Sequence, residues 1–162
     1  MKIKGKDPAR LWERYIRREC EMLAEQGRSD VRKNWEAPRL KGSHEKWEAS
    51  APDFGGCAII NGEAVPVLFE AKRVGNDTRL PLDNVSDDQM EDLKRRTRLG
   101  GIAFIYVLTK SGQKHIIRVG AFGIIDPLTP RGGSAMLTGE TLKSDGETWL
   151  DWLEGRVSLW TP

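Results

Sequence analysis

The sequence predicts a single α/β domain in which helices cover a central mixed β-sheet. Its 162 residues match the usual size of one domain, so residues 1–162 are predicted to fold together. Two segments carry apolar residues at the three- and four-residue steps of a helix, and several short apolar runs between turn signals are typical of strands. Helices packed on a sheet are a stable arrangement for such elements.

The first predicted helix covers residues 7–26, and Gly27 follows it as a stop signal. Its apolar positions recur at helical spacing and are Leu11, Trp12, Tyr15, Ile16, Cys20, Met22 and Leu23. The next stretch contains Pro38, Gly42 and many charges without a clean period, so an irregular segment is predicted there, with a short strand near 31–35.

A β-hairpin is predicted around Asn61-Gly62. This pair separates the runs DFGGCAII and AVPVLFEAK, and Asn-Gly between two apolar runs is the strongest short hairpin signal. Pro66 indicates an edge or pre-strand position, because proline cannot donate a hydrogen bond to a ladder.

The second half of the chain predicts a helix followed by two strands. Ser86 opens the helix and Gly100-Gly101 closes it. The sequence IAFIYVL, residues 102–108, reads as a buried strand, and 115–119 as its neighbour. Trp149, Trp152 and Trp160 are assigned to a helix or covering loop that packs on the core or a dimer partner.

Composition limits the function classes. With 38% hydrophobic and 31% charged residues, the chain reads as a soluble globular protein. Its N-terminus lacks the apolar core of a secretory signal and no apolar stretch matches a membrane span, so a cytoplasmic protein without a membrane partner is expected. Cys20 and Cys57 lack metal-ligand spacing and are predicted to be buried thiols, while His44 and His115 lie too far apart in sequence to suggest zinc.

The candidate catalytic residues lie around the end of the second hairpin strand. Side chains alternate across a strand, so Glu70 and Lys72 project from one face, and Asp53 at the start of the partner strand places a second carboxylate within reach. Two carboxylates in a partly dry cleft repel each other, which a divalent cation relieves. Oxygen ligands without thiol or imidazole select Mg²⁺, with Mn²⁺ able to substitute. A solvated strand end is the alternative interpretation of the triplet E-x-K alone.

Pro52-Asp53 with Glu70-Ala71-Lys72 resembles the motif of the PD-(D/E)XK nuclease superfamily. The longer run FEAKR followed by LPLDNVSDDQMEDLKRRTRLGGIAFIYVL resembles the RecU family of Holliday junction resolvases. The resemblance implies a restriction-endonuclease-like fold, a role in DNA recombination and repair, and a homodimer. It also implies a metal site formed by Asp53, Glu70 and Ala71, with Lys72 catalytic.

Two further catalytic residues follow from the resemblance. LWERYI matches the family's first-helix pattern at Glu13, although Glu19 lies nearer the middle of the apolar stripe and competes with it for completing the metal site. Gln89 matches a helix glutamine that would orient a phosphate or water. It also fits a capping box that starts at Ser86, which would satisfy a backbone donor instead.

Basic residues supply candidate phosphate contacts. Those predicted to bind nucleic acid are Lys41, Lys46, Arg73, Arg79, Lys94 and Arg95. For the helical pair, compensation of the helix dipole is the alternative. Trp35 and Trp47 would either stack on unpaired bases or simply pack. Residues 31–50 occupy the place of the family's basic stalk and look shorter and less basic, as a shortened stalk or loop.

The sequence therefore predicts a Mg²⁺-dependent endonuclease that cleaves four-way (Holliday) junctions by phosphodiester hydrolysis. The shortened stalk favours one alternative, a nuclease of the same superfamily acting on linear or damaged duplex DNA. Another is a non-catalytic DNA-binding module, against which stand Asp53, Glu70 and Lys72 together.

Overall fold

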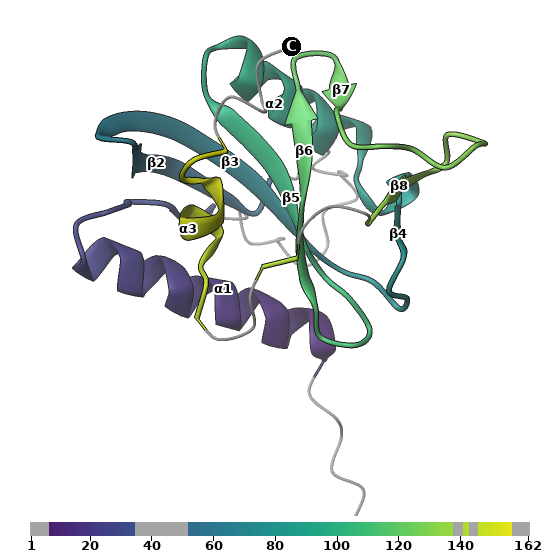
Figure 1. Ribbon diagram of the computed structural model, residues 1–162, viewed down its shortest axis with the longest axis horizontal. Coiled ribbons are helices and arrows are strands. Elements are labelled where there is room, and N and C mark those ends of the chain that lie inside the picture. Colours follow the sequence, from purple (N-terminus) through teal and green to yellow (C-terminus); the bar gives the residue numbers. More distant parts are fainter. Residues whose placement is uncertain (1–6, 35–51, 138–140, 143–145, 157–162) are drawn as a thin grey trace, which may run out of the picture.

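A computed structural model describes residues 7–34, 52–137, 141–142 and 146–156 (Figure 1). Lys41, Lys46, Trp35, Trp47 and Trp160 lie outside these ranges, as does most of the predicted stalk.

A six-stranded mixed sheet forms the centre of the protein, in the order β1-β2-β3-β5-β6-β7. Strands β3 and β5 are parallel and every other neighbouring pair is antiparallel, which confirms the predicted mixed sheet. The strands are β1 (Arg32–Lys33), β2 (Phe54–Ile60), β3 (Glu63–Arg73), β5 (Ile102–Leu108), β6 (Lys114–Gly120) and β7 (Gly123–Ile124).

The predicted hairpin is β2 and β3. Ile60 pairs with Glu63, so Asn61 and Gly62 alone form the turn, with φ of 51° and 84°. Positive φ at both central residues is the type I′ geometry that Asn-Gly favours, and it fixes the register of the whole hairpin. Pro66 is tolerated inside β3 because β5 begins to pair only at Val67, so no neighbouring strand on that side needs its missing N–H.

Three α-helices start at the caps that their sequences provide. Helix α1 (Pro8–Glu25) begins at Asp7, and α2 (Asp87–Arg98) begins at Ser86, as predicted. The short helix α3 (Trp149–Leu153) begins at Thr148, whose hydroxyl accepts a hydrogen bond from the backbone N–H of Asp151.

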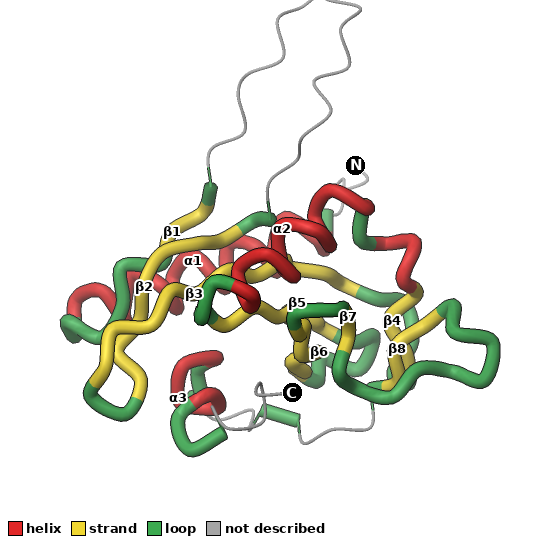
Figure 2. Tube along the Cα trace, turned by 90° about the horizontal axis from the view of Figure 1, so that it is seen from above, coloured by secondary structure: helices red, strands yellow, loops and turns green. Residues whose placement is uncertain are grey.

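The helices divide between the two faces of the sheet. Figure 2 shows the sheet as a central layer with α2 on one side and α3 on the other. Helices α1 and α3 share an apolar cluster with stacked aromatic rings: Phe69 lies 5.0 Å from Phe54 and 4.6 Å from Phe104, between ring centroids. On the other face, α2 packs Leu93 against Leu68 and Ile105. The sheet is thus covered on both faces, as expected for an α/β protein.

A second, two-stranded sheet was not predicted from the sequence. It pairs β4 (Arg79–Pro81) with β8 (Ser134–Met136), and the 3₁₀ helix η1 (Leu82–Asn84) follows β4. These strands are too short for a periodic pattern, and their pairing joins segments far apart in the chain.

The prediction of two buried thiols is wrong for Cys57. Cys20 lies on the buried face of α1, whereas Cys57 is exposed on β2. Its strand neighbours Ala58 and Ile60 point into the α1 cluster, so alternation turns Cys57 to the other face. The tryptophan assignment is confirmed for Trp149 and Trp152, which are buried in the core.

Within the described part of the chain, no helix is both long enough and apolar enough to cross a membrane.

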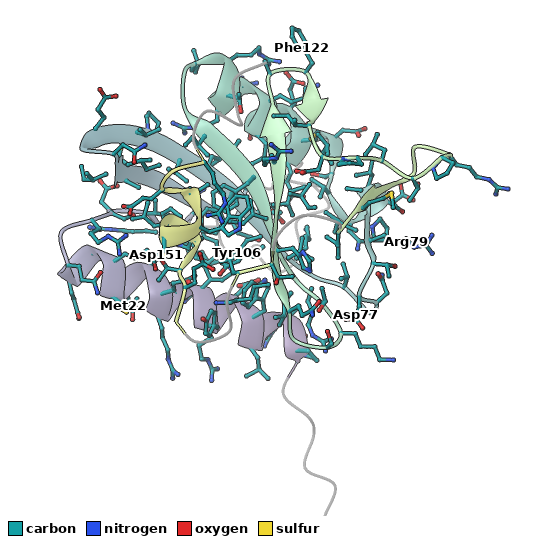
Figure 3. All side chains as sticks on the ribbon, in the orientation of Figure 1. Met22, Asp77, Arg79, Tyr106, Phe122 and Asp151 are labelled. Atoms are coloured by element: carbon teal, nitrogen blue, oxygen red, sulfur yellow. The ribbon has the colours of Figure 1, made fainter. Side chains whose placement is uncertain are left out.

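We predict that Phe69→Ala lowers the free energy of unfolding by about 3–5 kcal/mol, because it removes the ring at the centre of the aromatic stack. Urea denaturation followed by tryptophan fluorescence measures this. Phe122→Ala is the matched control: that ring is 92% exposed and projects at the edge of the molecule (Figure 3), so the change should cost less than about 0.5 kcal/mol. Equal losses in the two variants would contradict the assigned core.

Candidate active site

Asp53 and Glu70 face each other where the hairpin strands end. Phe54 pairs with Phe69, so in antiparallel register the next two residues, Asp53 and Glu70, lie opposite one another. The backbone N–H of Asp53 donates to Glu70 Oε2 at 3.1 Å. The backbone N–H of Ala71 donates to Asp53 Oδ2 at 3.0 Å. The two carboxylates are therefore held together by the backbone of the hairpin.

Lys72 adds an ammonium on the same face. Its Nζ lies 2.7 Å from Glu70 Oε1, as the alternation of side chains along β3 predicts. The Glu70 side chain is 2% exposed and that of Lys72 is 21% exposed. The acid is thus enclosed, while the base still reaches solvent.

Gln89 joins the site from the first turn of α2. Its Nε2 donates to Glu70 Oε1 at 2.8 Å. Its Oε1 accepts from the Ser86 backbone N–H at 3.0 Å, which completes the predicted capping box. The capping interpretation of Gln89 is thus confirmed, while its predicted role toward a phosphate or water stays a prediction.

Enclosure makes the acid pair costly to ionise. The pKa of Glu70 is raised from 4.5 to about 7, chiefly by burial and then by the neighbouring Asp53 charge, although Lys72 opposes the shift. Burial also raises the pKa of Asp53, and the charge of Glu13 adds to this, whereas the Ala71 N–H and Lys33 lower it. The pair resists carrying two negative charges.

The two candidate glutamates of α1 lie in different surroundings. Glu13 is ion-paired with Lys33 of β1, and its charge acts on Asp53. Glu19 is buried beside Tyr106, whose hydroxyl lies 3.4 Å from it, and burial raises its pKa to about 7. The interactions of Glu19 are thus with the core, and of the two glutamates it is Glu13 whose charge acts on Asp53.

Sequence reasoning did not find Lys33. Lys33 pairs with Phe54, the residue after Asp53, and so reaches the site from the edge of the sheet. A two-residue strand leaves no periodic signal from which its facing could be read.

The donor set fits a hard divalent cation. Two carboxylates face each other; burial raises the pKa of both, and the Asp53 charge adds to the shift at Glu70, so a bound cation would favour their ionised forms. The N–H and C=O of one residue in an extended strand point to the same side, so the Ala71 carbonyl also points toward Asp53. Among the described residues, no three His, Cys, Asp or Glu side chains converge as a ready-made cluster, and Glu13 is paired with Lys33.

The four predicted DNA-contact residues that the structure describes lie on three different elements, β3, β4 and α2. Alternation places Arg73 on the opposite face of β3 from Lys72, where it borders a hollow beside the start of α1. Arg79 is exposed on β4. Lys94 and Arg95 are ion-paired with Glu91 and Asp92 on α2, each at 2.9 Å, and their contact with DNA stays a prediction.

These features, two apposed acids and a lysine at a hairpin end in a mixed sheet between helices, define a restriction-endonuclease-like nuclease fold. The model of the RecU family, Recombination protein U, matches residues 43–145, which is more than half of the chain. The chain belongs to the RecU family, which confirms the resemblance predicted from the sequence.

The solved structure of Hjc from Archaeoglobus fulgidus, a Holliday junction resolvase from an archaeal hyperthermophile, is similar with a TM-score of 0.41 and 15% identity. The similarity covers 67% of this chain and 75% of that one. A comparison with curated proteins finds no match.

Family membership assigns the enzyme class: a Holliday junction resolvase, an endonuclease that uses divalent metal and binds DNA junctions. The matched range includes Asp53, Glu70, Lys72 and Gln89 but leaves out α1. The link between Glu13 and the site therefore rests on its charge acting on Asp53.

Titration of Glu70 should make folding stability fall with pH. In the metal-free protein, the folded state keeps a proton on Glu70 up to a pKa of about 7, whereas the unfolded chain releases it near 4.5. This contribution is complete below pH 4.5 and is lost as pH rises through about 7. We predict that the free energy of unfolding of Glu70→Gln increases relative to that of the wild type as the pH rises from 5 to 8. Urea denaturation in EDTA measures this difference. The exposed Glu63→Gln is the control for loss of a carboxylate, and a difference between Glu70→Gln and wild type that does not vary with pH would contradict the assigned burial.

Proposed function

We propose that this protein nicks DNA at four-way junctions through the site formed by Asp53, Glu70 and Lys72, with Mg²⁺ as its ion and Mn²⁺ able to substitute. The observation that carries the proposal is the apposition of Asp53 and Glu70, with Lys72 Nζ 2.7 Å from the latter, in a RecU-family chain.

Asp53 and Glu70 would hold the ion through carboxylate oxygens, together with the Ala71 carbonyl. Hard oxygen donors of this kind favour Mg²⁺ or Mn²⁺ over softer metals. When bound, such an ion polarises a phosphate oxygen and lowers the pKa of a bound water. The ion binds the ionised form of the acids, so its affinity depends on pH. Because the pKa of Glu70 is raised to about 7, chiefly by burial, the ion must displace the proton of Glu70 in acidic solution.

Lys72 is the residue that touches the reacting phosphate in this proposal. Its ammonium is partly exposed beside a buried acid, so it can turn toward a phosphate and offset the charge that develops during hydrolysis. Gln89 supports this arrangement by donating to Glu70, which fixes the carboxylate that the ion and Lys72 share.

A homodimer fits the reaction, because resolving a junction needs cuts on two opposed strands. A two-fold axis relates two identical sites in the way that opposed strands require. The contacts with DNA would come from two exposed arginines, Arg73 at the end of β3 and Arg79 at the start of β4, acting on phosphates.

The central test compares a labelled four-way junction with a linear duplex of matched sequence, with and without Mg²⁺. We expect paired symmetric nicks in the junction only, and only with the ion. Asp53→Ala and Lys72→Ala should each lower the cleavage rate by roughly 10²-fold or more while leaving DNA affinity largely intact.

The matched controls are Asp83→Ala and Lys110→Ala, which change the same residue types at exposed positions away from the hairpin end. They should cut like the wild type. Equal cutting of both substrates would replace a junction resolvase with a general duplex nuclease, and wild-type rates in both site variants would refute the assigned chemistry.

Phosphate contacts should appear in the salt dependence of binding. We predict that Arg73→Ala and Arg79→Ala each weaken junction binding and lower the slope of log affinity against log salt by about 0.9, as expected for one lost contact. Fluorescence anisotropy over a salt series measures the slope. Lys94→Ala is the comparison: its ammonium is 2.9 Å from Glu91, so its slope should change less, and an equal or larger change would reverse the assignment.

A further inference from the structure

The Glu13 side chain forms an ion pair with a residue of another element, not with a residue of its own helix. It lies on α1, and its Oε2 bonds Lys33 Nζ of β1. Arg17, one turn further along α1, is at the usual i,i+4 spacing for a helical ion pair, yet it is not the partner that the described structure shows for Glu13. The Glu13 and Lys33 side chains are only 31% and 20% exposed, so water screens their attraction less than it does for most surface pairs.

The backbone fixes Lys33 beside the acid pair. Lys33 is in register with Phe54, the residue that follows Asp53. The next residue, Asn34, donates its N–H to the Asp53 carbonyl at 2.7 Å and its side-chain Nδ2 to the Pro52 carbonyl at 2.6 Å. The strand that carries the ammonium is thus bonded to the same backbone that carries the first acid of the site.

Both members of the pair act on Asp53. The negative charge of Glu13 raises the pKa of Asp53, and the positive charge of Lys33 lowers it. The pair is therefore electrostatically part of the site, although within the described residues it does not join Asp53 and Glu70 as a three-acid cluster.

We propose that Lys33 is a positioning residue that holds Glu13 next to the Asp53–Glu70 pair while no divalent ion is bound, and that an entering ion displaces the Lys33 ammonium from Glu13. A carboxylate left without a cation at this place would add a third negative charge to two that already repel each other. The ammonium removes that repulsion in the empty site, and an ion that gains Glu13 must compete with it. This inference rests on the proposed function, because it assumes that the metal binds at Asp53 and Glu70.

The inference predicts that removing the ammonium strengthens metal binding. Lys33→Met keeps the length of the side-chain stem and removes the charge. We expect it to bind Mn²⁺ roughly five-fold more tightly than the wild type, a factor consistent with losing one competing ion pair. Isothermal titration calorimetry with Mn²⁺ alone, without DNA, measures this independently of cleavage.

Two comparisons separate competition for Glu13 from a general change of charge. Arg32→Met removes a neighbouring cation from the same strand, on the face opposite Lys33, and should leave Mn²⁺ affinity within about two-fold of the wild type. In a Glu13→Gln background, Lys33→Met should bring a much smaller gain, because the ammonium then has no carboxylate to hold and only its direct charge effect on the site remains. Lys33→Arg keeps the charge and should behave like the wild type, which also tests whether position 33 tolerates replacement.

Unchanged or weaker Mn²⁺ binding in a folded Lys33→Met protein would overturn the inference. An equal gain in Arg32→Met, or a gain of undiminished size in the Glu13→Gln background, would do the same. Failure of the proposed function looks different: Mn²⁺ binding would then be insensitive to Asp53→Ala, whatever the effect at position 33.

Discussion

The site depends on one register, the antiparallel pairing of β2 with β3. Because Phe54 pairs with Phe69, Asp53 meets Glu70. The two-residue turn at Asn61-Gly62 sets that register from the far end of the hairpin. A slip of one residue would carry every side chain of one strand to the other face and separate the acids. The stacked rings of Phe54 and Phe69 add a packing reason for the same alignment.

Much of this arrangement could be predicted from sequence because its signals are local. The Asn-Gly turn, the Ser86 cap and the apolar run at 102–108 each indicate an element directly, and alternation along β3 places Glu70 beside Lys72. The RecU motifs added the catalytic interpretation.

The remaining features depend on contacts between distant segments. Lys33 reaches the site only because a two-residue strand joins the sheet edge, and β4 meets β8 across more than fifty intervening residues. Which of Glu13 and Glu19 is nearer to the metal site also depends on contacts between distant segments. A helical wheel puts Glu19 in the apolar stripe, but the side chain there is enclosed beside Tyr106, and Glu13 at the margin of the stripe adjoins Asp53.

Gln89 carries two requirements that together select glutamine. A capping box accepts either glutamate or glutamine at this position, since both have an oxygen for the backbone N–H of Ser86. Glutamate would turn its other oxygen toward Glu70 and repel it, whereas the amide donates there. Asparagine would keep the amide on a side chain one carbon shorter. The identity of this residue is therefore set jointly by where a helix begins and by what a buried acid can accept, so neither demand alone explains it.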